Sequence, residues 1–189
     1  MMAKLLQSLG LKMINFWVSA CKSATQFNKN VNQSIILVSC AEDGTLYQWD
    51  VAEGKRLHET VVKTCVYSDV SIAPDSSGLI YAVGSDKTIK QMEKDNMLKE
   101  VDLHTFTLSS VVLSHDGSML FSGSTTGRVQ SFRFPLTLPG EWQEYRIHGD
   151  IITQMKLSLD DNRLVTASKD GSLCFWQVKT IQGTVIKMK

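Results

Sequence analysis

The 189-residue sequence lacks the features that commit a chain to nucleic acid or to a membrane. Its charge is nearly balanced, with 20 Lys and Arg against 19 Asp and Glu. The broad basic surface that binds a phosphate backbone is therefore not expected. No stretch reaches the roughly 18 consecutive apolar residues that a membrane-spanning helix needs. We therefore expect neither nucleic acid nor a membrane among its partners.

Cysteine is scarce, and its spacing does not fit the common zinc motifs. The four cysteines are Cys21, Cys40, Cys65 and Cys174. None of them forms a CxxC pair or a Cys/His pair with zinc-ligand spacing. Free thiols in an intracellular protein are the simpler interpretation, and we predict no metal site and no cofactor.

Acidic residues are missing from the start of the chain, where the first one is Glu42. Polar residues interrupt the apolar run there, which disfavours a signal peptide, and a mitochondrial presequence fits the charge but lacks the usual arginines. The apolar residues around Trp17 approach helical spacing, as in a membrane-binding or partner-binding helix, but Gly10 interrupts them. For residues 1–34 we prefer an atypical or incorrectly delimited N-terminal segment of uncertain structure.

The sequence does contain an internal repeat. Segments 37–51, 79–93, 119–133 and 164–178 each join two strand-like runs through a short polar turn. The turn pairs lie 43, 40 and 44 residues apart, and an apolar or aromatic residue follows six positions after the start of each. The turn pairs are Asp43-Gly44, Asp86-Lys87, Thr126-Gly127 and Asp170-Gly171, and the residues that follow are Trp49, Met92, Phe132 and Trp176.

A second piece repeats upstream of three of these turns, with Ile72, Leu113 and Leu157 in register. A period of 40–45 residues with two hairpins per unit and a Trp-type close is the signature of a WD-repeat propeller blade. Asp-Gly favours a tight hairpin because glycine accepts a positive φ without steric cost. The strands before the turns are almost continuously apolar or small, as expected where stacked blades cover both faces.

These patterns predict an all-β fold, a partial WD-repeat β-propeller of about three and a half four-stranded antiparallel blades. The blades are expected over residues 35–178, followed by a C-terminal tail at 179–189. Because propellers typically close with 4–8 blades, we expect a fragment of a longer propeller; the alternative is a small propeller whose missing outer strands come from residues 1–34. End blades without neighbours expose apolar faces and strand edges, so the isolated chain is expected to self-associate.

One set of polar residues carries two interpretations. His148, a hydroxyl from Thr166 or Ser168, Asp170 and the Trp176 indole are expected to form a buried hydrogen-bond network that supports the blade. The alternative is a His/Asp/Ser catalytic group, but such a group is identified by geometry, which proximity in sequence does not supply. We therefore predict no catalytic residue. The related positions of the other blades are Asp43, Trp49, Asp86 and His104.

Two stretches, AEDGTLYQWDVAEGKRLHE (41–59) and HGDIITQMKLSLDDNRLVTASKDGSLCFWQV (148–178), resemble a known family. They are similar to the late propeller blades of the cilia- and flagella-associated protein fifty-seven family, and YAVGSDKTIKQ (81–91) and the FPLTLPGEWQEY insert (134–145) fit it too. The resemblance implies a long axonemal protein with tandem propellers and a coiled coil, which helps to assemble or regulate inner dynein arms of motile cilia. No heptad-rich coiled coil follows Val178.

The first functional hypothesis is therefore a protein-interaction scaffold in the cytoplasm or cytoskeleton, in a ciliary or flagellar axoneme, with dynein-arm components among its partners. Its contacts are expected on the propeller rims and the Pro135–Gly140 insert. The alternative is an adaptor of another complex, such as a substrate receptor of a cullin-type ubiquitin ligase. Those receptors usually carry Trp-Asp-x-Arg, whereas Val51-Ala52 follows Trp49-Asp50 here. An enzyme is the third class, and no catalytic motif supports it.

Overall fold

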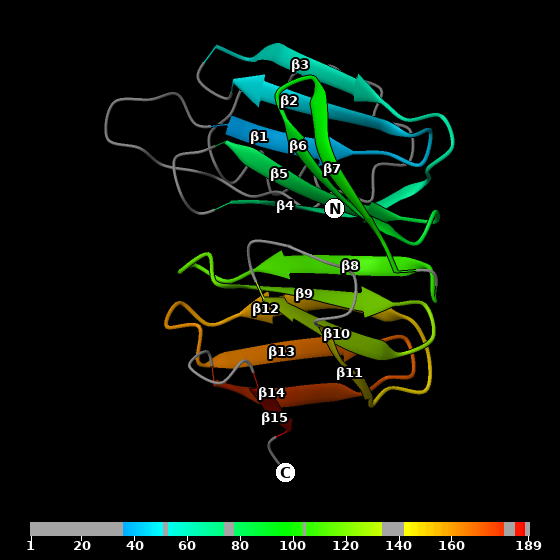
Figure 1. Cartoon of the computed structure of the whole chain (residues 1–189), viewed down its shortest axis with the longest axis vertical. Coiled ribbons are helices and arrows are strands. Elements are labelled where there is room, and N and C mark those ends of the chain that lie inside the picture. The colour runs from blue at the N-terminus through cyan, green and yellow to red at the C-terminus, as the bar shows by residue number, and fades with distance from the viewer. Residues whose placement is uncertain are drawn as a thin grey trace.

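The computed structural model describes residues 36–50, 53–73, 78–103, 105–133, 142–179 and 184–187. They form four antiparallel sheets, which we call blades 1 to 4 in chain order (Figure 1). Blade 1 contains β1 (Ile36–Cys40), β2 (Thr45–Asp50) and β3 (Lys55–Val61), and blade 2 contains β4 (Tyr67–Ile72), β5 (Leu79–Gly84), β6 (Thr88–Glu93) and β7 (Asn96–Asp102). Blade 3 contains β8 (Leu108–Leu113), β9 (Met119–Ser124), β10 (Arg128–Arg133) and β11 (Trp142–Arg146), and blade 4 contains β12 (Ile152–Leu157), β13 (Arg163–Ser168), β14 (Leu173–Lys179) and β15 (Thr184–Lys187).

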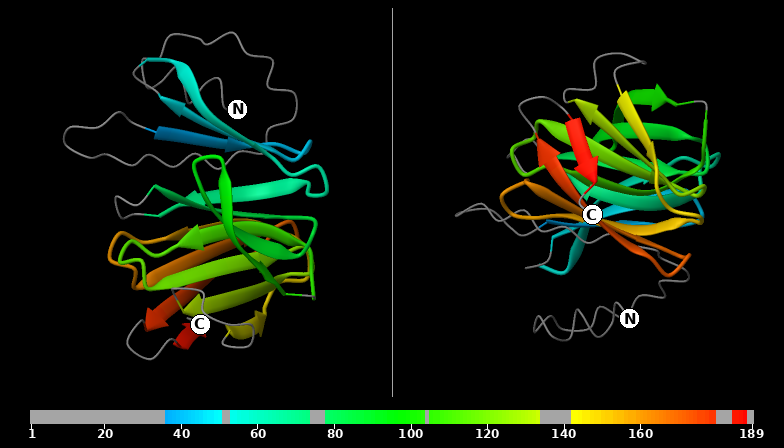
Figure 2. Two further views of the ribbon diagram at one scale, coloured as in Figure 1. Left: turned by 45° about the horizontal axis from the view of Figure 1, so that its top comes forward. Right: turned by 90° about the horizontal axis from the view of Figure 1, so that it is seen from below.

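The blades stack in chain order from one end of the molecule to the other (Figures 1 and 2). The first described strand of each blade packs on the first strand of the next, so that β1 contacts β4, β4 contacts β8 and β8 contacts β12. Within the described ranges, the strands of blade 4 form no comparable contact with those of blade 1. The expected all-β partial propeller is thus confirmed, as an arc in which blades 1 and 4 each have one neighbouring blade among the described residues.

The four predicted turns share a left-handed residue at the same position. The second residue of each turn pair has a positive φ, at 82° for Gly44, 65° for Lys87, 77° for Gly127 and 83° for Gly171. At Gly127 a side chain would also collide with the neighbouring loop, because a Cβ atom there would lie 2.2 Å from the carbonyl oxygen of His148. Lys87 adopts a conformation that is uncommon for residues other than glycine.

Each inner strand of blades 2 to 4 carries the same irregularity near its start. The register with the second strand shifts between Tyr67 and Asp69, between Leu108 and Ser110, and between Ile152 and Gln154. An extra residue of this kind bends a strand and increases its twist. Its recurrence at one position shows that the blades repeat in structure as well as in sequence.

The apolar core consists of three clusters, one between each pair of consecutive blades. Between blades 3 and 4, Trp176 and Leu164 pack with Phe121 and Val129. The alternate side chains of blade 3, such as Phe132, join the cluster with blade 2. Both faces of blades 2 and 3 are therefore covered, which explains why their second strands are apolar almost throughout.

The extent of the outer blades differs from the sequence-based division. Three blades have four strands and blade 1 has three among the described residues. Residues 179–189 were expected to form a tail, yet β15 lies within them and pairs with β14. Its sequence has no turn signal of the repeated kind, so the repeat could not place it. Residues 1–34 lie outside the described residues, and no helix in the described part of the chain is long and apolar enough to cross a membrane.

Candidate functional site

The most extensive polar network lies in blade 4 and begins at a buried tryptophan. The indole Nε1–H of Trp176, on β14, donates to the hydroxyl oxygen of Thr166, on β13, at 3.1 Å. The Nε2 atom of His148, in the loop before β12, lies 2.8 Å from the same oxygen. All three residues are buried, and Thr166 is 0% exposed. One hydroxyl thus joins a histidine and a tryptophan inside the blade.

The second ring nitrogen of His148, Nδ1, is connected through hydrogen bonds to the turn at the rim of the blade. His148 Nδ1 lies 2.7 Å from the Ser172 hydroxyl, which donates to Asp170 Oδ1 at 2.6 Å. Asp170 only accepts, so Ser172 gives its proton to Asp170 and His148 donates from Nδ1 to the Ser172 oxygen. The indole donates to Thr166, whose hydroxyl also shares a hydrogen bond with His148 Nε2. We call this chain, from Trp176 through Thr166, His148 and Ser172 to Asp170, the blade-4 relay.

Asp170 also fixes the backbone around the relay. Its carboxylate accepts the Gly149 N–H at 2.7 Å and the Ser172 N–H at 2.8 Å. The Ser172 hydroxyl and the Gly149 N–H hold the pKa of Asp170 well below its usual value. Ser168 stands beside the relay: its hydroxyl accepts the Asp170 N–H and donates to the Asp150 carbonyl. Thr166 is therefore the hydroxyl within the relay.

The relay is poorly arranged for nucleophilic catalysis. In a catalytic triad the histidine lies between the nucleophile and the carboxylate, which contacts it directly. Here Ser172 separates them, and His148 Nδ1 lies 3.7 Å from Asp170 Oδ2. The Thr166 hydroxyl contacts Nε2 but is inaccessible to a substrate, because Thr166 is fully buried. The arrangement can stiffen a blade by satisfying its buried donors and acceptors.

Blade 1 contains the corresponding residues of its hairpin. Trp49 Nε1–H donates to the Ser39 hydroxyl at 3.0 Å, as Trp176 does to Thr166. Asp43 accepts the Thr45 hydroxyl at 2.6 Å and the Thr45 N–H at 2.9 Å. These two bonds, the hydroxyl first, lower the pKa of Asp43. The position that would correspond to His148 precedes residue 36 and lies outside the described residues.

Blade 2 replaces the relay with a buried cation. Lys90 is 1% exposed, and its Nζ contacts Asp86 and Thr88 and lies 3.1 Å from Glu100 Oε1. Desolvation, the largest single influence, raises the pKa of Asp86, but the bonds with Lys90, Cys65 and the Thr88 N–H and the charge of Lys90 together outweigh it, so the pKa of Asp86 is lowered. Met92, at the position of Trp176, is fully buried.

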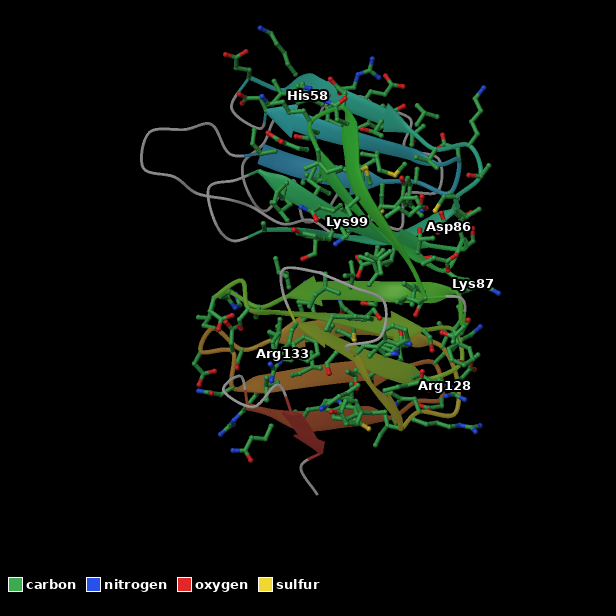
Figure 3. All side chains as sticks on the ribbon, viewed as in Figure 1. His58, Asp86, Lys87, Lys99, Arg128 and Arg133 are labelled. Carbon is green, nitrogen blue, oxygen red and sulfur yellow. The ribbon has the colours of Figure 1, made fainter. Side chains whose placement is uncertain are left out.

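In blade 3 a hydrogen-bond chain takes the place of the relay. The Ser122 hydroxyl donates to Gln130, whose amide donates to Glu144 at 3.2 Å. Arg128 also pairs with Glu144, and its guanidinium lies over the Phe106 ring, 4.3 Å from the ring centre. His104, the predicted histidine of this blade, lies outside the described residues. Figure 3 shows Asp86, Lys87 and Arg128 along one edge of the stacked sheets.

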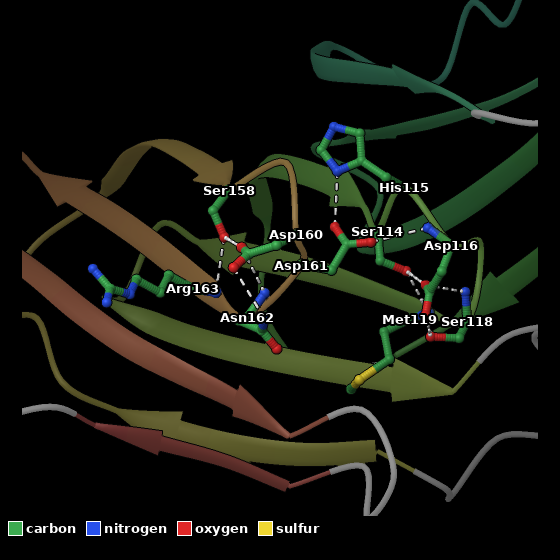
Figure 4. Close-up of polar contacts among 10 residues, drawn as sticks. All are labelled: Ser114, His115, Asp116, Ser118, Met119, Ser158, Asp160, Asp161, Asn162 and Arg163. Atoms are coloured by element: carbon green, nitrogen blue, oxygen red, sulfur yellow. Dashed lines mark hydrogen bonds and ion pairs between the residues drawn. The ribbon is translucent and has the colours of Figure 1, made fainter.

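Each junction between blades is also crossed by one aspartate. Asp95 of blade 2 accepts the Glu59 N–H of blade 1 at 3.1 Å. Asp69 of blade 2 accepts the Val111 N–H of blade 3 at 2.9 Å. Asp161 of blade 4 reaches back to blade 3 (Figure 4). We call Asp95, Asp69 and Asp161 the junction aspartates.

Asp161 shows how such a contact arises. Its φ of 55° matches that of Gly117, at 69°, in the corresponding turn of blade 3. The left-handed conformation is more accessible to aspartate than to most residues. It directs the carboxylate to His115 Nδ1, at 2.8 Å, and to the Asp116 N–H, at 2.9 Å. Asp69 lies deeper, and burial raises the pKa of its carboxyl group.

The sequence-based reasoning missed three kinds of residue here. Ser172 follows a turn that was identified, and its hydroxyl-bearing counterparts Thr45 and Thr88 stood in register as an available signal. Lys90 had no such signal, because a lysine in a strand usually faces solvent. The junction aspartates lie in segments whose neighbours become known only once blades are stacked. No group of three or more His, Cys, Asp or Glu that could hold a metal ion occurs among the described residues.

Comparison with known proteins places these blades in context. The family model "WD domain, G-beta repeat" matches residues 96–132 and 141–177. Each match starts at the outer strand of one blade and ends at the third strand of the next, so the sequence repeat is offset by one strand from the blade. Because of this offset, one sequence repeat contributes strands to two consecutive blades and links them covalently.

Two curated relatives and one solved structure are informative. The chain is 38% identical to mouse cilia- and flagella-associated protein 57 over 151 residues, and 26% identical to cilia- and flagella-associated protein 57 C of Tetrahymena thermophila over 171 residues. These alignments cover 80% and 81% of this chain but 12% and 13% of the relatives. The β-propeller domain of Myceliophthora thermophila Cps50 (Swd1) superposes with a TM-score of 0.69 at 16% identity, over 86% of this chain and 53% of that one.

Proposed function

Because this chain is a WD-repeat protein that resembles cilia- and flagella-associated protein 57, we propose that it is a protein-interaction scaffold of cilia and flagella. The observation that carries the proposal is the 38% identity to the mouse protein across 80% of this chain. The aligned region, 151 residues long, extends beyond the hairpins that every WD repeat shares. The chain corresponds to 12% of the mouse protein, so we assign it one part of a larger scaffold.

The finer proposal is that the chain acts in the axoneme and supports the assembly or regulation of inner dynein arms, with dynein-arm components among its partners. Its own residues would supply a rigid surface. The blade-4 relay and the Lys90 cluster hold the turns of blades 4 and 2 in fixed positions, because every buried polar group in them is satisfied. Exposed side chains on these turns, such as Lys87 and Lys169, are then presented to partners on a stiff rim.

The same features favour a non-catalytic role. The only histidine–hydroxyl–carboxylate group described in blade 4 is closed to substrate, since His148 is 3% exposed and Thr166 is 0% exposed. WD propellers bind proteins through their rims and faces, where loops are positioned by a rigid framework. We therefore propose that the relay contributes stability and that function resides on the rim.

Imaging and proximity labelling in motile-ciliated cells test the proposal. The full chain is expressed with a small tag, and a promiscuous biotin ligase on the same chain labels its neighbours. We expect enrichment along the axoneme and labelling of dynein-arm proteins. The test variant carries Lys87→Glu and Lys169→Glu, which reverse charge on the rim without altering the buried network, and the unchanged chain is its control. This variant should fold normally and label fewer partners.

Three other outcomes would contradict the ciliary proposal, each in a different way. Labelling of cullin-type ligase adaptors, with no enrichment in cilia, would replace the proposal by the ubiquitin-ligase alternative. Mitochondrial staining would support the presequence interpretation of residues 1–34 and refute the ciliary one. An even distribution through the cell body, with no reproducible neighbours, would also count against a ciliary scaffold.

A further inference from the structure

The turn of blade 3 differs from the turns of the other three blades in its charge. We propose that Thr126, the first residue of this turn, is a phosphorylation site. Its phosphate group would take the place of the aspartate that blades 1, 2 and 4 have at the same position. Phosphorylation here is a property of the blade itself and does not depend on the ciliary function proposed above.

In the other three blades, a carboxylate at the first turn position binds the residue two positions later. It accepts a hydrogen bond from the backbone N–H of that residue, at 2.9 Å in blade 1, 3.3 Å in blade 2 and 2.8 Å in blade 4. It also accepts a bond from the hydroxyl of the same residue, at 2.6, 3.1 and 2.6 Å. Each of these turns therefore combines an anion with a hydroxyl that donates to it. The pairs are Asp43 and Thr45, Asp86 and Thr88, and Asp170 and Ser172.

Blade 3 has a hydroxyl where the other blades have the anion. Thr126 occupies the first position, and the residue two positions later is Arg128, whose side chain carries a positive charge. Without a turn carboxylate, the Arg128 N–H donates to the Ser124 hydroxyl at 3.0 Å. Thr126 Oγ1 lies 3.1 Å from the same hydroxyl. A phosphate on Thr126 would therefore lie beside a backbone N–H, a hydroxyl and a guanidinium group, all of which can donate to it.

Two arginines give this end of blade 3 an excess of positive charge. Arg128 and Arg146 are directly paired across β10 and β11, where like charges repel each other. Among the described residues, Glu144 is the carboxylate that pairs with Arg128, and Arg146 is exposed. A phosphate on threonine carries about −1.5 to −2 charges at pH 7, and a guanidinium can donate two parallel bonds to its oxygens. Phosphorylation of Thr126 would thus balance the arginine that Glu144 does not.

Thr126 is also the accessible member of three consecutive hydroxyl residues. Ser124 is 1% exposed. Thr125 is half-buried, and its hydroxyl donates to the Thr107 carbonyl at 3.3 Å. Thr126 is exposed at the tip of the turn. An enzyme that approaches this turn therefore meets the Thr126 hydroxyl first, and its two neighbours serve as internal controls.

The reaction is a phosphoryl transfer from a nucleoside triphosphate bound to a protein kinase. Thr126 Oγ1 forms a bond to the γ-phosphorus, and the bond from that phosphorus to the bridging oxygen breaks. The nucleoside diphosphate leaves, and the hydroxyl proton passes to the catalytic carboxylate of the kinase. No group is oxidised or reduced. The product has a new anion on the rim, so the modification would change which charges the rim presents to a partner.

Mass spectrometry of the full chain tests whether the modification occurs. The tagged chain is purified from motile-ciliated cells with phosphatase inhibitors, and fragment ions locate phosphate within the tryptic peptide 100–128. We expect phosphate on Thr126, its removal by phosphatase, and none on Ser124 or Thr125. Phosphate confined to those two neighbours, or an unmodified peptide, would overturn the proposal. The peptide is scored wherever the chain is located, so this proposal and the ciliary one fail separately.

A pair of matched variants tests whether an anion fits this turn. Thr126→Asp supplies the carboxylate of the other blades, and Thr126→Asn has the same shape without the charge. In urea unfolding we expect the equilibrium constant for folding to be about two- to fivefold larger for Thr126→Asp, as for an exposed ion pair. The gain should shrink at about 1 M salt, which screens exposed charges. Equal midpoints for the two variants would refute the anion site.

The contribution of the arginine is measured in a second background. Arg128→Gln removes the guanidinium but keeps the backbone N–H that a turn carboxylate would bind. The advantage of Thr126→Asp over Thr126→Asn should therefore be smaller when Arg128→Gln is also present. An undiminished advantage would overturn the pairing of the anion with Arg128.

Discussion

Blade 4 and blade 2 have the same strand order but use different chemistry at their centres. In blade 4 a hydrogen-bonded chain runs from Trp176 through Thr166 to His148. In blade 2 the positions of the tryptophan and threonine hold Met92 and Ala82, so that donor and acceptor are lost together. Replacing both partners of a buried hydrogen bond by apolar groups costs far less than removing one of them.

The carboxylate at the turn explains the remaining difference. Asp170 is satisfied by Ser172 and the backbone, whereas Asp86 pairs with the buried ammonium of Lys90. Lys90 stands at the position of Cys174, four residues after the turn aspartate in each blade. At the centre of a blade, the polar atoms around the turn carboxylate must therefore have hydrogen-bond partners, but the residues that supply those partners can differ. It also predicts different weaknesses in the two blades.

Truncating the large residue in each blade should have the largest effect. Trp176→Ala should lower the free energy of unfolding by about 3–5 kcal/mol, because it creates a cavity and removes the indole donor. Met92→Ala should fall toward the low end of about 2–5 kcal/mol, since no polar partner is left unpaired. Urea unfolding followed by circular dichroism measures both. Equal midpoints for wild type and Trp176→Ala would refute the network in blade 4.

Removing one hydroxyl should distinguish the blades next. Thr166→Val keeps the shape but leaves the Trp176 N–H and His148 Nε2 without their shared partner. We expect a loss of about 1–3 kcal/mol, the cost of unsatisfied buried polar groups. Thr166→Ser, which keeps the hydroxyl, is the control and should lose less. If Thr166→Val and Thr166→Ser lower the free energy of unfolding equally, the Thr166 hydroxyl does not join the Trp176 and His148 rings.

Neutralising the buried lysine should have a smaller effect. Lys90→Met removes the charge and keeps most of the volume, while Asp86 and Glu100 remain partly exposed and can be hydrated. We expect a loss of about 1.5–2 kcal/mol, the lower part of the range for hydrogen bonds to charged groups. Thermal unfolding and urea unfolding of wild type and Lys90→Met should both show this loss of stability. A more stable variant would indicate that desolvation of the ammonium exceeds its attraction to the carboxylates.

The smallest expected effect is the change with pH in the stability difference between wild type and Lys90→Met. The pKa of Asp86 is lowered in the folded protein from an ordinary value of 3.8, mainly by Lys90 acting against desolvation. Its contribution is therefore present above about pH 4 and is lost as the pH falls through the folded pKa. The advantage of wild type over Lys90→Met should narrow in this range. A constant difference between pH 6 and pH 2 would separate Lys90 from the titration of Asp86.

The sequence predicted the repeated part of the fold well because hairpin turns depend on local chemistry. Gly44, Gly127 and Gly171 occupy turns that need a positive φ, and their spacing identified the blades. The membership of β15 in blade 4 depends on pairing across a loop without a turn signal. Burial of Lys90 depends on Asp86 and Glu100, which approach it from different positions in the blade. Such residues could not be identified from a period alone.

The junction aspartates have a consequence for how the arc comes apart. Asp95, Asp69 and Asp161 each bond to a backbone N–H in an adjacent blade. Losing one blade therefore exposes an apolar face of its neighbour. It also leaves a carboxylate or a backbone N–H of that neighbour without its hydrogen-bond partner. Unfolding is then coupled from neighbour to neighbour, as in a one-dimensional array. Among the described residues, blades 1 and 4 each have one neighbouring blade, whereas blades 2 and 3 are held on both faces. Local opening should therefore need less free energy in blades 1 and 4, while blades 2 and 3 open together.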